Sequence, residues 1–497
     1  MIFGNGIDIQ EISAVEDLAA RQPNFITKIL TNTEKQTYDQ KVGKHQGEFL
    51  AGRYAAKEAY SKALGTGLGA DLNWQQLEIA NDEQGRPYFQ QHPRQNDLIA
   101  HISISHSGNM VKTEVILENM PNTEIPVSVN RPAWIEISKS AVAHNIKFVR
   151  EFSGAKRFMA ILKANAYGHG LPQMVEAARE GGADAFGVAT LDEAIWLRHF
   201  GVKEPILVLG IVEAEQVKLA WKHQIIVPVA NLAWLKSAQK VFPMESTNKP
   251  LLVALAVDTG MTRIGIRTEN ELQETFNAIN RDPRFKLHSI GMHFATADTN
   301  NEAYFEQQLE RWHTLTDELE ISADVWRHLA NSGTALWHKN PSTDAIRIGA
   351  AMYGIDSSQG ALEKRDLQPV LSLKAKLVQV KQVEADVSVS YGATYTTDQP
   401  TWIGTIPLGY ADGYLRKLQG GYGLLPDGRH VEIIGRIAMD QCMVALPEEI
   451  PVGTVITLIG SAGGQHVTLE DLAERLETIP YEVATTLSVR LPRYLVD

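Results

Sequence analysis

Runs of hydrophobic residues recur through the middle of the 497-residue chain, and each is short enough to form a strand. These runs are 158–163, 185–189, 206–209, 225–229, 251–257, 288–293, 325–331 and 345–348. Between them lie amphipathic segments of helical periodicity, such as 172–180, 191–200 and 301–319. Apolar strands that alternate with helices predict a parallel sheet covered by helices, and eight such units predict a (β/α)₈ TIM barrel. An open, doubly wound sheet is the alternative.

The pattern changes on both sides of this region. Beyond residue 370, alternating hydrophobic and polar positions replace helical periodicity, at 371–380, 387–391, 402–406, 431–437, 442–446 and 455–459. Alternation of this kind predicts an antiparallel β domain over 370–497, after a barrel over 133–369. Residues 119–132 contain several prolines and no helical period, so we expect a linker there. A small domain at 1–118 completes a multidomain α/β protein.

Composition narrows the class of protein. Hydrophobic residues make up 44% and charged residues 21% of the chain, as in a folded globular protein. The net charge of −12 argues against nucleic acid or an anionic membrane as a partner. The single cysteine, Cys442, excludes a disulfide framework, and no transmembrane run or signal peptide is recognisable. We expect a cytoplasmic protein with one or two enzymatic activities.

A single carboxylate lies in the first hydrophobic run. Asp8 stands between Ile7 and Ile9 in the sequence GIDI. Strand alternation places the two isoleucines on one face and the carboxylate on the other. Taken alone, this pattern is typical of an exposed strand aspartate rather than of a ligand.

Residues 47–64 show a strong helical pattern that carries charged residues. Glu58 and Lys62 are one turn apart, and their charges are also compatible with a simple solvated face. Glycines in the segment 65–69 would end the helix and leave backbone N–H groups open to an anion, which by itself is a weak signal. A short alternating strand, ISISHS, ends near His106.

Together, the sequences GIDI, FLAGRYAAKEAYSKALGTGLG and ISISHS resemble the holo-(acyl-carrier-protein) synthase family over nearly all of residues 1–118. The resemblance implies an α+β domain that transfers 4′-phosphopantetheine from coenzyme A to a serine of apo acyl carrier protein. It also implies that Asp8 and Glu58 hold Mg²⁺, which prefers oxygen ligands, and that Lys62 neutralises phosphate charge. The residues implied to contact coenzyme A are Arg53, Gly65, Gly67 and His106. The family is trimeric, with its site between subunits.

Polar residues at the carboxyl ends of the barrel strands suggest a second site, because barrel chemistry collects there. Lys163 closes the first strand; it would either extend to the surface or act as a desolvated amine suited to Schiff-base chemistry. Ser332 follows the seventh strand, and Gly349 and Ala350 follow the eighth, where such barrels bind phosphate. A phosphate site opposite a lysine predicts pyridoxal phosphate.

Three further side chains fit this cofactor. Tyr167 and Tyr481 would add hydroxyl donors. Arg347 would face the pyridine nitrogen, and because arginine stays charged it would disfavour protonation of the ring. A weakened electron sink suits a reaction that only moves an α proton.

The blocks KANAYGHG, DTGMTRIG, MHFATAD, NSGTALW, IRIGAAMYG, VSYGATY, IPLGYADGY, GRIAMDQCM and TIPYEV resemble the alanine racemase family, in the family's order, over residues 130–497. The resemblance implies a barrel that binds pyridoxal phosphate, followed by a β domain, in a head-to-tail dimer. Lys163 would bind the cofactor and act as the base on the D-alanine face. Tyr391 of the other subunit would be the base on the L-alanine face, because racemisation needs one base on each face.

The resemblance implies further roles for residues around these bases. His293 and Arg347 would lower the pKa of Tyr391 through hydrogen bonding and charge. The residues implied to bind the cofactor are Lys163, Tyr167, His293, Asn331, Ser332, Arg347, Gly349, Ala350 and Tyr481. Those implied to position the substrate are Arg263, Met439 and Tyr410, with Tyr410 and Tyr481 narrowing the entrance to favour a methyl side chain.

Two positions depart from the family pattern. Many members carry a lysine, often carbamylated, just before the DTG turn, where this chain has Ala256. The usual glycine before the substrate arginine is Thr262. We therefore expect Arg263 to be supported by a bound anion or a rearranged neighbour, or alanine to bind more weakly.

The sequence thus predicts a bifunctional enzyme that supplies D-alanine for cell-wall peptidoglycan and activates acyl carriers for fatty acid synthesis. Alternatives are a racemase with a non-catalytic, oligomerising N-terminal domain, a serine racemase, or a decarboxylase of the same barrel class. We expect a homo-oligomer, but a trimeric domain fused to a dimeric one has mismatched symmetry. Both contacts require a larger assembly, or one domain must forgo its usual state.

Overall fold

The structure, a computed structural model, describes residues 2–69, 72–82, 84–94, 98–119, 127–242, 249–338 and 343–497. It divides into two compact units, Met1–Ile125 and Pro126–Asp497. Half of the expected linker, residues 120–126, lies outside the described residues.

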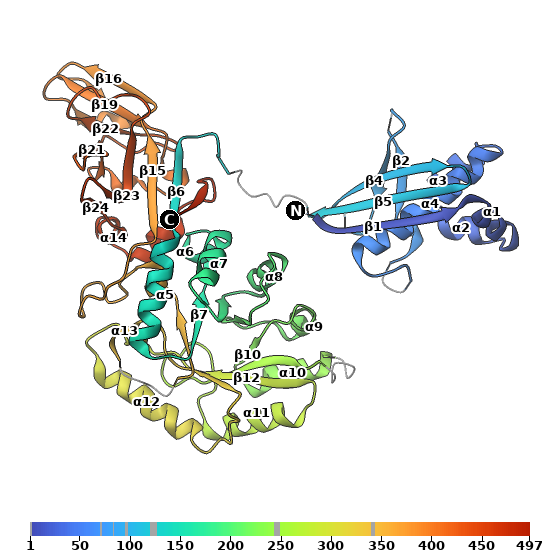
Figure 1. Cartoon of the computed structure of the whole chain (residues 1–497), viewed down its shortest axis with the longest axis horizontal. Coiled ribbons are helices and arrows are strands. Elements are labelled where there is room, and N and C mark those ends of the chain that lie inside the picture. Colours follow the sequence, from blue (N-terminus) through green and yellow to red (C-terminus); the bar gives the residue numbers. More distant parts are fainter. Residues whose placement is uncertain are drawn as a thin grey trace. The chain divides into compact units, whose positions relative to one another are not determined.

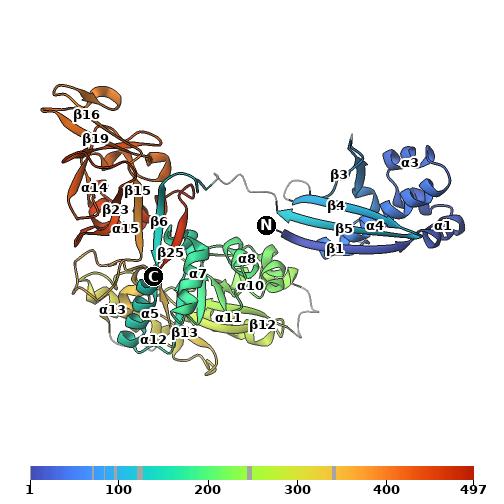
Figure 2. The same cartoon turned by 45° about the horizontal axis from the view of Figure 1, so that its top comes forward.

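The first unit packs one long helix, α4 (Lys44–Leu64), against a three-stranded antiparallel sheet of order β1-β5-β4 (Figure 2). The strands are β1 (Ile2–Glu11), β4 (Leu98–Ser107) and β5 (Met110–Asn119). Elements that the sequence analysis had not assigned complete the unit: α1 (Ile12–Arg21), α2 (Phe25–Ile29), α3 (Asn32–Asp39), η1 (Trp74–Gln76), β2 (Glu78–Asn81) and β3 (Pro87–Gln91). The helix and strands expected around 47–64, Asp8 and 102–106 are present.

Glycines in β1 set the close approach of strand and helix. A Cβ at Gly4 would lie 2.0 Å from the carbonyl O of Ala63, and one at Gly6 would lie 2.1 Å from that of Ala59. Any side chain there would push α4 off the sheet. The glycines of the sequence GNGID thus bring the last turns of α4 against the strand that carries Asp8.

The second unit contains a closed parallel barrel of eight strands. They are β7 (Arg157–Ile161), β8 (Ala185–Val188), β9 (Ile206–Val208), β10 (Val227–Val229), β11 (Leu251–Ala256), β12 (Phe285–Gly291), β13 (Trp326–His328) and β14 (Ala345–Ile348). A parallel bridge between Leu207 and Ile226 joins β9 to β10. The Arg347 N–H donates to Ala330 O at 2.9 Å and joins β14 to the end of β13. The sheet is therefore closed, and the open, doubly wound alternative is wrong.

Helices cover the outside of this barrel (Figure 1). They are α5 (Lys139–Ser153), α7 (Leu171–Glu180), α8 (Leu191–His199), α9 (Val217–Lys222), α10 (Leu232–Val241), α11 (Glu269–Arg281), α12 (Glu302–Thr316) and α13 (Ser332–Trp337). The connections between strands and helices also contain the short turns α6 (Lys163–Tyr167), η2 (Ala214–Gln216) and η4 (Ala350–Tyr353). Polar N-caps begin several of them: Thr190 accepts from Glu193 N, Asn231 from Trp234 N, and Asn331 from Thr334 N.

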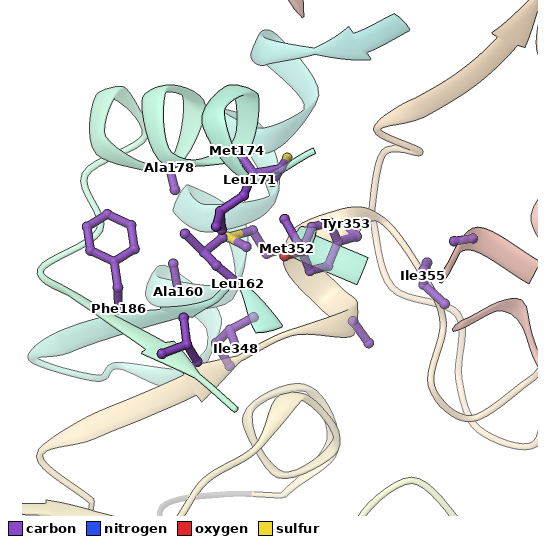
Figure 3. Close-up of a cluster of buried hydrophobic side chains, with 14 of the residues drawn as sticks. Ala160, Leu162, Leu171, Met174, Ala178, Phe186, Ile348, Met352, Tyr353 and Ile355 are labelled. Atoms are coloured by element: carbon purple, nitrogen blue, oxygen red, sulfur yellow. The ribbon is translucent and has the colours of Figure 1, made fainter. Parts of the chain in front are cut away.

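The packing between strands and helices is apolar. One cluster of hydrophobic side chains joins the first barrel strand to its neighbours (Figure 3). It contains Ala160 of β7, Leu162 directly after β7, Phe186 of β8, Met174 of α7, and Tyr353. Each of these side chains is almost completely buried. The cluster fixes the strand end that carries Lys163.

The remainder forms a large sheet of order β16-β19-β22-β21-β20-β23-β15-β6-β25, with β24 paired to β23. Its strands are β6 (Ala133–Ser138), β15 (Leu371–Lys376), β16 (Gln379–Val383), β19 (Thr401–Ile406), β20 (Tyr422–Leu424), β21 (His430–Ile434), β22 (Cys442–Leu446), β23 (Val455–Ala462), β24 (Gln465–Val467) and β25 (Arg493–Val496). A small hairpin, β17 (Ser388–Val389) and β18 (Tyr395–Thr396), and the turns η5 (Tyr391–Ala393), η6 (Tyr410–Asp412) and η7 (Arg416–Leu418) lie beside it in sequence.

Two features differ from the sequence analysis. Helical periodicity does not vanish after residue 370, because α14 (Leu469–Leu476) and α15 (Pro480–Thr486) follow the strands. Strand β6 lies in the range 133–369 expected for the barrel, but it pairs with β15 and β25 of the large sheet. Helices α14 and α15 are too short for a clear helical period, and periodicity alone does not reveal which strands pair with β6. Among the described residues, no helix combines the length and apolarity needed to span a bilayer.

Candidate functional site

A cavity of about 940 Å³ opens at the carboxyl ends of the barrel strands. The predicted site residues that line it are Lys163, Tyr167, Arg263, His293, Asn331, Ser332, Arg347, Gly349, Ala350 and Tyr481. These residues come from strand ends and loops far apart in sequence, and the closed barrel brings them together. The volume falls in the range of sites that hold small ligands and cofactors.

Lys163 stands where strand β7 gives way to the turn α6. Its side chain is partly buried, and burial, followed by the positive charge of Arg263, lowers the pKa of the amine, while Glu193 acts in the opposite direction. Its Nζ lies 5.9 Å from the centre of the Tyr167 ring. Of the two interpretations of this lysine, the structure shows the desolvated amine inside a cavity.

The turn after Lys163 is left-handed. Ala164, Asn165, Ala166 and Tyr167 have φ values of 54°, 51°, 53° and 55°. Each costs about 1–2 kcal/mol relative to a right-handed turn, so the surroundings must enforce the conformation. Two hydrogen bonds help to hold the turn: the Ala164 N–H donates to Glu193 Oε1 at 2.8 Å, and the Leu171 N–H donates to Asn165 Oδ1 at 2.8 Å.

The left-handed turn sends Tyr167 toward the eighth strand. A Cβ at Gly349 would lie 2.4 Å from the Tyr167 hydroxyl, so only glycine leaves room for that approach. Ser332 Oγ accepts from the N–H groups of Gly349 and Ala351 at 3.2 and 3.4 Å. The first N–H groups of α13 have no partner within the helix. Hydroxyl and N–H donors from two strand ends thus converge on one place.

Arg347 is buried between two histidines. Its Nη2 donates to His293 Nδ1 at 3.1 Å and to Met292 O at 2.7 Å. Its Nη1 donates to His328 Nδ1 at 2.7 Å and, in a shorter bond, to His328 O. Because both Nδ1 atoms accept, both rings are neutral; burial and then Arg347 lower the pKa of His293 to about 3.

The Arg347 guanidinium therefore keeps a single donor, its Nε–H, without a protein partner among the described residues. Burial lowers the pKa of Arg347 only to about 10, so it stays charged at pH 7. A free, charged donor in a cavity fits an aromatic nitrogen that accepts a hydrogen bond and stays unprotonated.

Arg263 lines the same cavity without a hydrogen-bonding neighbour in the part of the chain that the structure describes. Ala256, at the end of β11, also lines this cavity and brings only a methyl group to it. The expected rearranged neighbour is therefore not found among these residues. Thr262 adopts a φ of 56°, which explains why glycine suits this position, and its hydroxyl donates to Gly260 O at 3.2 Å.

Three predicted residues do not line the cavity of this single chain. Tyr391 is 72% exposed, Met439 54% and Tyr410 37%. All three lie in the part of the chain that follows the barrel. The structure also places Asp298, Ser357 and His328 at the cavity, which the sequence analysis missed. Asp298 ends the quoted block MHFATAD, whereas no sequence signal points to Ser357.

In the first unit, Asp8 meets two residues of α4. It is only 7% exposed, whereas Ile7 and Ile9 are 41% and 55% exposed, so the exposed-aspartate interpretation is wrong. Lys62 Nζ lies 2.7 Å from Asp8 Oδ1, and Gln10 Nε2 donates to Oδ2 at 2.7 Å. Burial, followed by the charge of Asp8, raises the pKa of Glu58, while Lys62 lowers it. Two carboxylates and one ammonium group therefore share one small region.

This pair does not form a complete metal cage. No group of three or more His, Cys, Asp or Glu side chains that could hold a metal occurs in the described parts of the chain. Mg²⁺ commonly takes one or two carboxylates and completes its shell with water and substrate phosphates. Asp8 and Glu58 fit that kind of partial site.

The residues expected to contact coenzyme A have different surroundings. Arg53 is only 5% exposed, and its Nη2 donates to Asn81 Oδ1 at 2.7 Å, while its guanidinium lies 4.3 Å from the centre of the Phe49 ring. It belongs to a buried group in which Lys57 donates to Glu34 at 2.7 Å. This group could not be predicted from the sequence, because nothing in the helical pattern marks Lys57 as buried.

The other three are near the surface. Gly65 ends α4 in a left-handed conformation, and Gly67 also has a positive φ. His106 is exposed at the end of β4, with Nε2 3.4 Å from the carbonyl O of Glu48. Gly52 adjoins it, since a Cβ there would lie 3.7 Å from His106 Nε2.

Comparison with known proteins is consistent with two kinds of domain. A profile of the alanine racemase N-terminal domain matches residues 137–357, and one of its C-terminal domain matches 370–495. A profile of the 4′-phosphopantetheinyl transferase superfamily matches residues 4–116. The family matches thus cover both units.

Individual relatives align with the second unit over nearly their whole length. An alanine racemase of Ligilactobacillus salivarius is 42% identical, over 72% of this chain and 96% of its own. A lysine racemase of Oenococcus oeni is 41% identical, over 74% and 99%. A crystal structure of alanine racemase from E. faecalis is 42% identical and covers 75% of this chain and all of its own, with a TM-score of 0.72. The chain therefore belongs to the alanine racemase family, with a domain of the 4′-phosphopantetheinyl transferase superfamily at its N-terminus.

Proposed function

We propose that the second unit interconverts L-alanine and D-alanine with pyridoxal phosphate. The observation that carries this proposal is the cavity in which the desolvated Lys163 amine, the phosphate-type cradle around Ser332 and Gly349 and the free Arg347 Nε–H occur together. These groups match an aldehyde, a phosphate and a ring nitrogen of one cofactor. The lowered pKa of Lys163 favours the neutral amine that attacks a carbonyl carbon.

The bound cofactor would supply an electron sink that acidifies the α proton of the amino acid. Lys163 would hold it and then act as the base on one face of the substrate. Arg347 would donate Nε–H to the ring nitrogen, and its fixed charge, kept in place by two neutral histidines, would oppose ring protonation. Arg263 would pair with the substrate carboxylate. This arrangement moves a proton without favouring side reactions.

Tyr391 would serve the opposite face from a second subunit. Its exposure and its absence from the cavity of its own chain support this role, as do the exposed Tyr410 and Met439. We propose a head-to-tail dimer in which these residues close the partner's cavity.

The direct test is exchange of the α proton of L-alanine in heavy water, followed by proton NMR with the full-length chain and added pyridoxal phosphate. Loss of the signal together with formation of D-alanine is expected. Absence of exchange from a chain that binds the cofactor would overturn the proposal for alanine. Serine and lysine belong in the same assay, lysine because a lysine racemase is 41% identical to this chain.

For the first unit, we propose Mg²⁺-dependent transfer of 4′-phosphopantetheine from coenzyme A to a serine of apo acyl carrier protein. Asp8 and Glu58 would hold the metal against the pyrophosphate, and Lys62, 2.7 Å from Asp8, would neutralise charge on the phosphates. His106 and the glycine segment from Gly65 would contact the coenzyme. The alternative, a non-catalytic oligomerising domain, predicts no coenzyme A binding by calorimetry.

Replacing Asp8 with asparagine is expected to lower transfer to apo acyl carrier protein about a hundredfold, because the metal loses an anionic ligand. Racemisation by the same chain should be unchanged. Gel-shift or mass measurement of the carrier reports the transfer. The matched control is Asp17→Asn, an exposed carboxylate of the same unit. Equal transfer by both variants would contradict the metal role of Asp8.

A second prediction concerns Ala256. If an anion supports Arg263, chloride should lower the KM for alanine of the native chain about twofold to fivefold, as expected for pairing an exposed cation. The Ala256→Lys variant should show a different KM and a weaker dependence on chloride. The comparison salt is acetate at equal ionic strength. A KM that is the same for both proteins in both salts would exclude support by an anion.

A further inference from the structure

One buried histidine has no role in the proposed reaction, yet it lies beside the turn that carries Lys163. His169 is fully buried, and its Nδ1 lies 3.0 Å from the carbonyl O of Tyr167. A carbonyl oxygen only accepts, so Nδ1 must carry the proton. Its Nε2 has no hydrogen-bond partner among the described residues, and burial lowers the pKa of the ring to about 4. His169 is therefore a neutral donor of fixed tautomer at pH 7.

The ring of His169 also packs against Tyr353. The two ring centres are 4.5 Å apart, and Tyr353 lies 4.7 Å from the Tyr167 ring. The Tyr353 hydroxyl donates to Ile161 O, at the end of β7, at 2.7 Å. Tyr353 itself belongs to the cluster shown in Figure 3. These contacts connect the strand before the left-handed turn with the residue that ends it.

The C-terminal segment holds the next residues in place. Arg493 Nε donates to Gly168 O at 2.9 Å. A Cβ at Gly168 would lie 1.9 Å from Ala484 O, and one at Gly170 would lie 2.7 Å from Arg493 Cδ. These contacts restrict the turn on this side. On the other side the His169 bond to Tyr167 O restrains it, together with the hydrogen bonds that Ala164 N–H and Leu171 N–H donate.

We propose that His169 is a positioning residue: its Nδ1–H, bonded to Tyr167 O, fixes the left-handed turn 164–167 and so aims the Lys163 amine and the Tyr167 hydroxyl into the cavity. The identity of the ligand that these groups would bind there, a phosphorylated pyridine aldehyde, rests on the proposed function. The role of His169 in fixing the turn does not. Apolar packing alone would not select the carbonyl orientation, because only a directional donor distinguishes it.

The test uses the full chain and two readouts. Hydrogen–deuterium exchange of the peptide covering 162–171 reports the turn without any cofactor, and a spectroscopic titration gives the Kd for pyridoxal phosphate. His169→Leu removes the donor. His169→Asn keeps a donor near the position of Nδ1, and His169→Gln moves it to that of Nε2. Val149→Ala, which shortens a buried side chain of helix α5, is the control for a general loss of stability.

His169→Leu is expected to speed hydrogen–deuterium exchange in 162–171 and to raise the Kd for pyridoxal phosphate at least tenfold. Val149→Ala should change neither the exchange rate nor the Kd by more than about twofold. His169→Asn should recover most of both effects, and His169→Gln should not. If His169→Leu does not fold, the comparison of His169→Asn with His169→Gln tests the proposal. Equal exchange and equal Kd in Asn and Gln, or in Leu and the Val149 control, would overturn the proposal. If even the native chain fails to bind pyridoxal phosphate, the proposed function fails, but the exchange measurement still tests the turn.

Discussion

Replacing Lys163 with alanine is expected to reduce exchange of the alanine α proton about a thousandfold or more. Among the described residues that line the cavity, Lys163 carries the one amine, and burial with the charge of Arg263 lowers its pKa. Without it, the cofactor loses its covalent attachment and the substrate loses the base on one face. The measurement is the proton NMR assay in heavy water at saturating pyridoxal phosphate.

A lysine of the same unit with no contact to the cavity provides the control. Lys156 lies just before β7, and its side chain is 78% exposed, so Lys156→Ala should exchange like the native protein. Thermal unfolding should show that both variants fold. Transfer by the first unit should also be unchanged, because Asp8, Glu58 and Lys62 are not altered. Undiminished exchange by Lys163→Ala would contradict the assignment of the base.

The barrel could be predicted from the sequence because its strands are buried on both faces. Each of the hydrophobic runs became a barrel strand, and 345–348 matches β14 residue for residue. The fate of β6 could not be predicted: its alternating residues fit a strand of any sheet, and its partners β15 and β25 lie more than 200 residues later in the chain. Pairing over such distances leaves no local signal.

Some features of the candidate sites could likewise be predicted from the sequence, and others could not. Lys163, Ser332 and Gly349 could be predicted because strand ends of a barrel meet at one face. The burial of Asp8 could not, since alternation tells which residues share a face but not which face is covered. In β1 the helix covers the face of Gly4, Gly6 and Asp8, and the isoleucines remain exposed.

Mixing two inactive variants is expected to restore racemisation if Tyr391 works from a second subunit. In Lys163→Ala one base is missing, and in Tyr391→Phe the other is missing. A mixed dimer contains one cavity that lacks both bases and one that has both. With random exchange of subunits, half of the dimers are mixed and half of their cavities are intact, so activity should rise from background to about a quarter of the native value.

The measurement is racemisation of L-alanine before and after joint refolding or co-expression, since stable dimers exchange subunits slowly. The control mixes Lys163→Ala with Arg347→Leu. Because both residues line the cavity of their own chain, each cavity of this mixed dimer has one defect. The mixed dimer should therefore stay inactive. Recovery in that control would show that the assay does not report shared cavities. No recovery with Tyr391→Phe, in dimers shown by sedimentation to be mixed, would place the second base within the same chain. That result would require the exposed Tyr391 to move into its own cavity, whereas the dimer needs only that a second copy cover residues that a single chain leaves exposed.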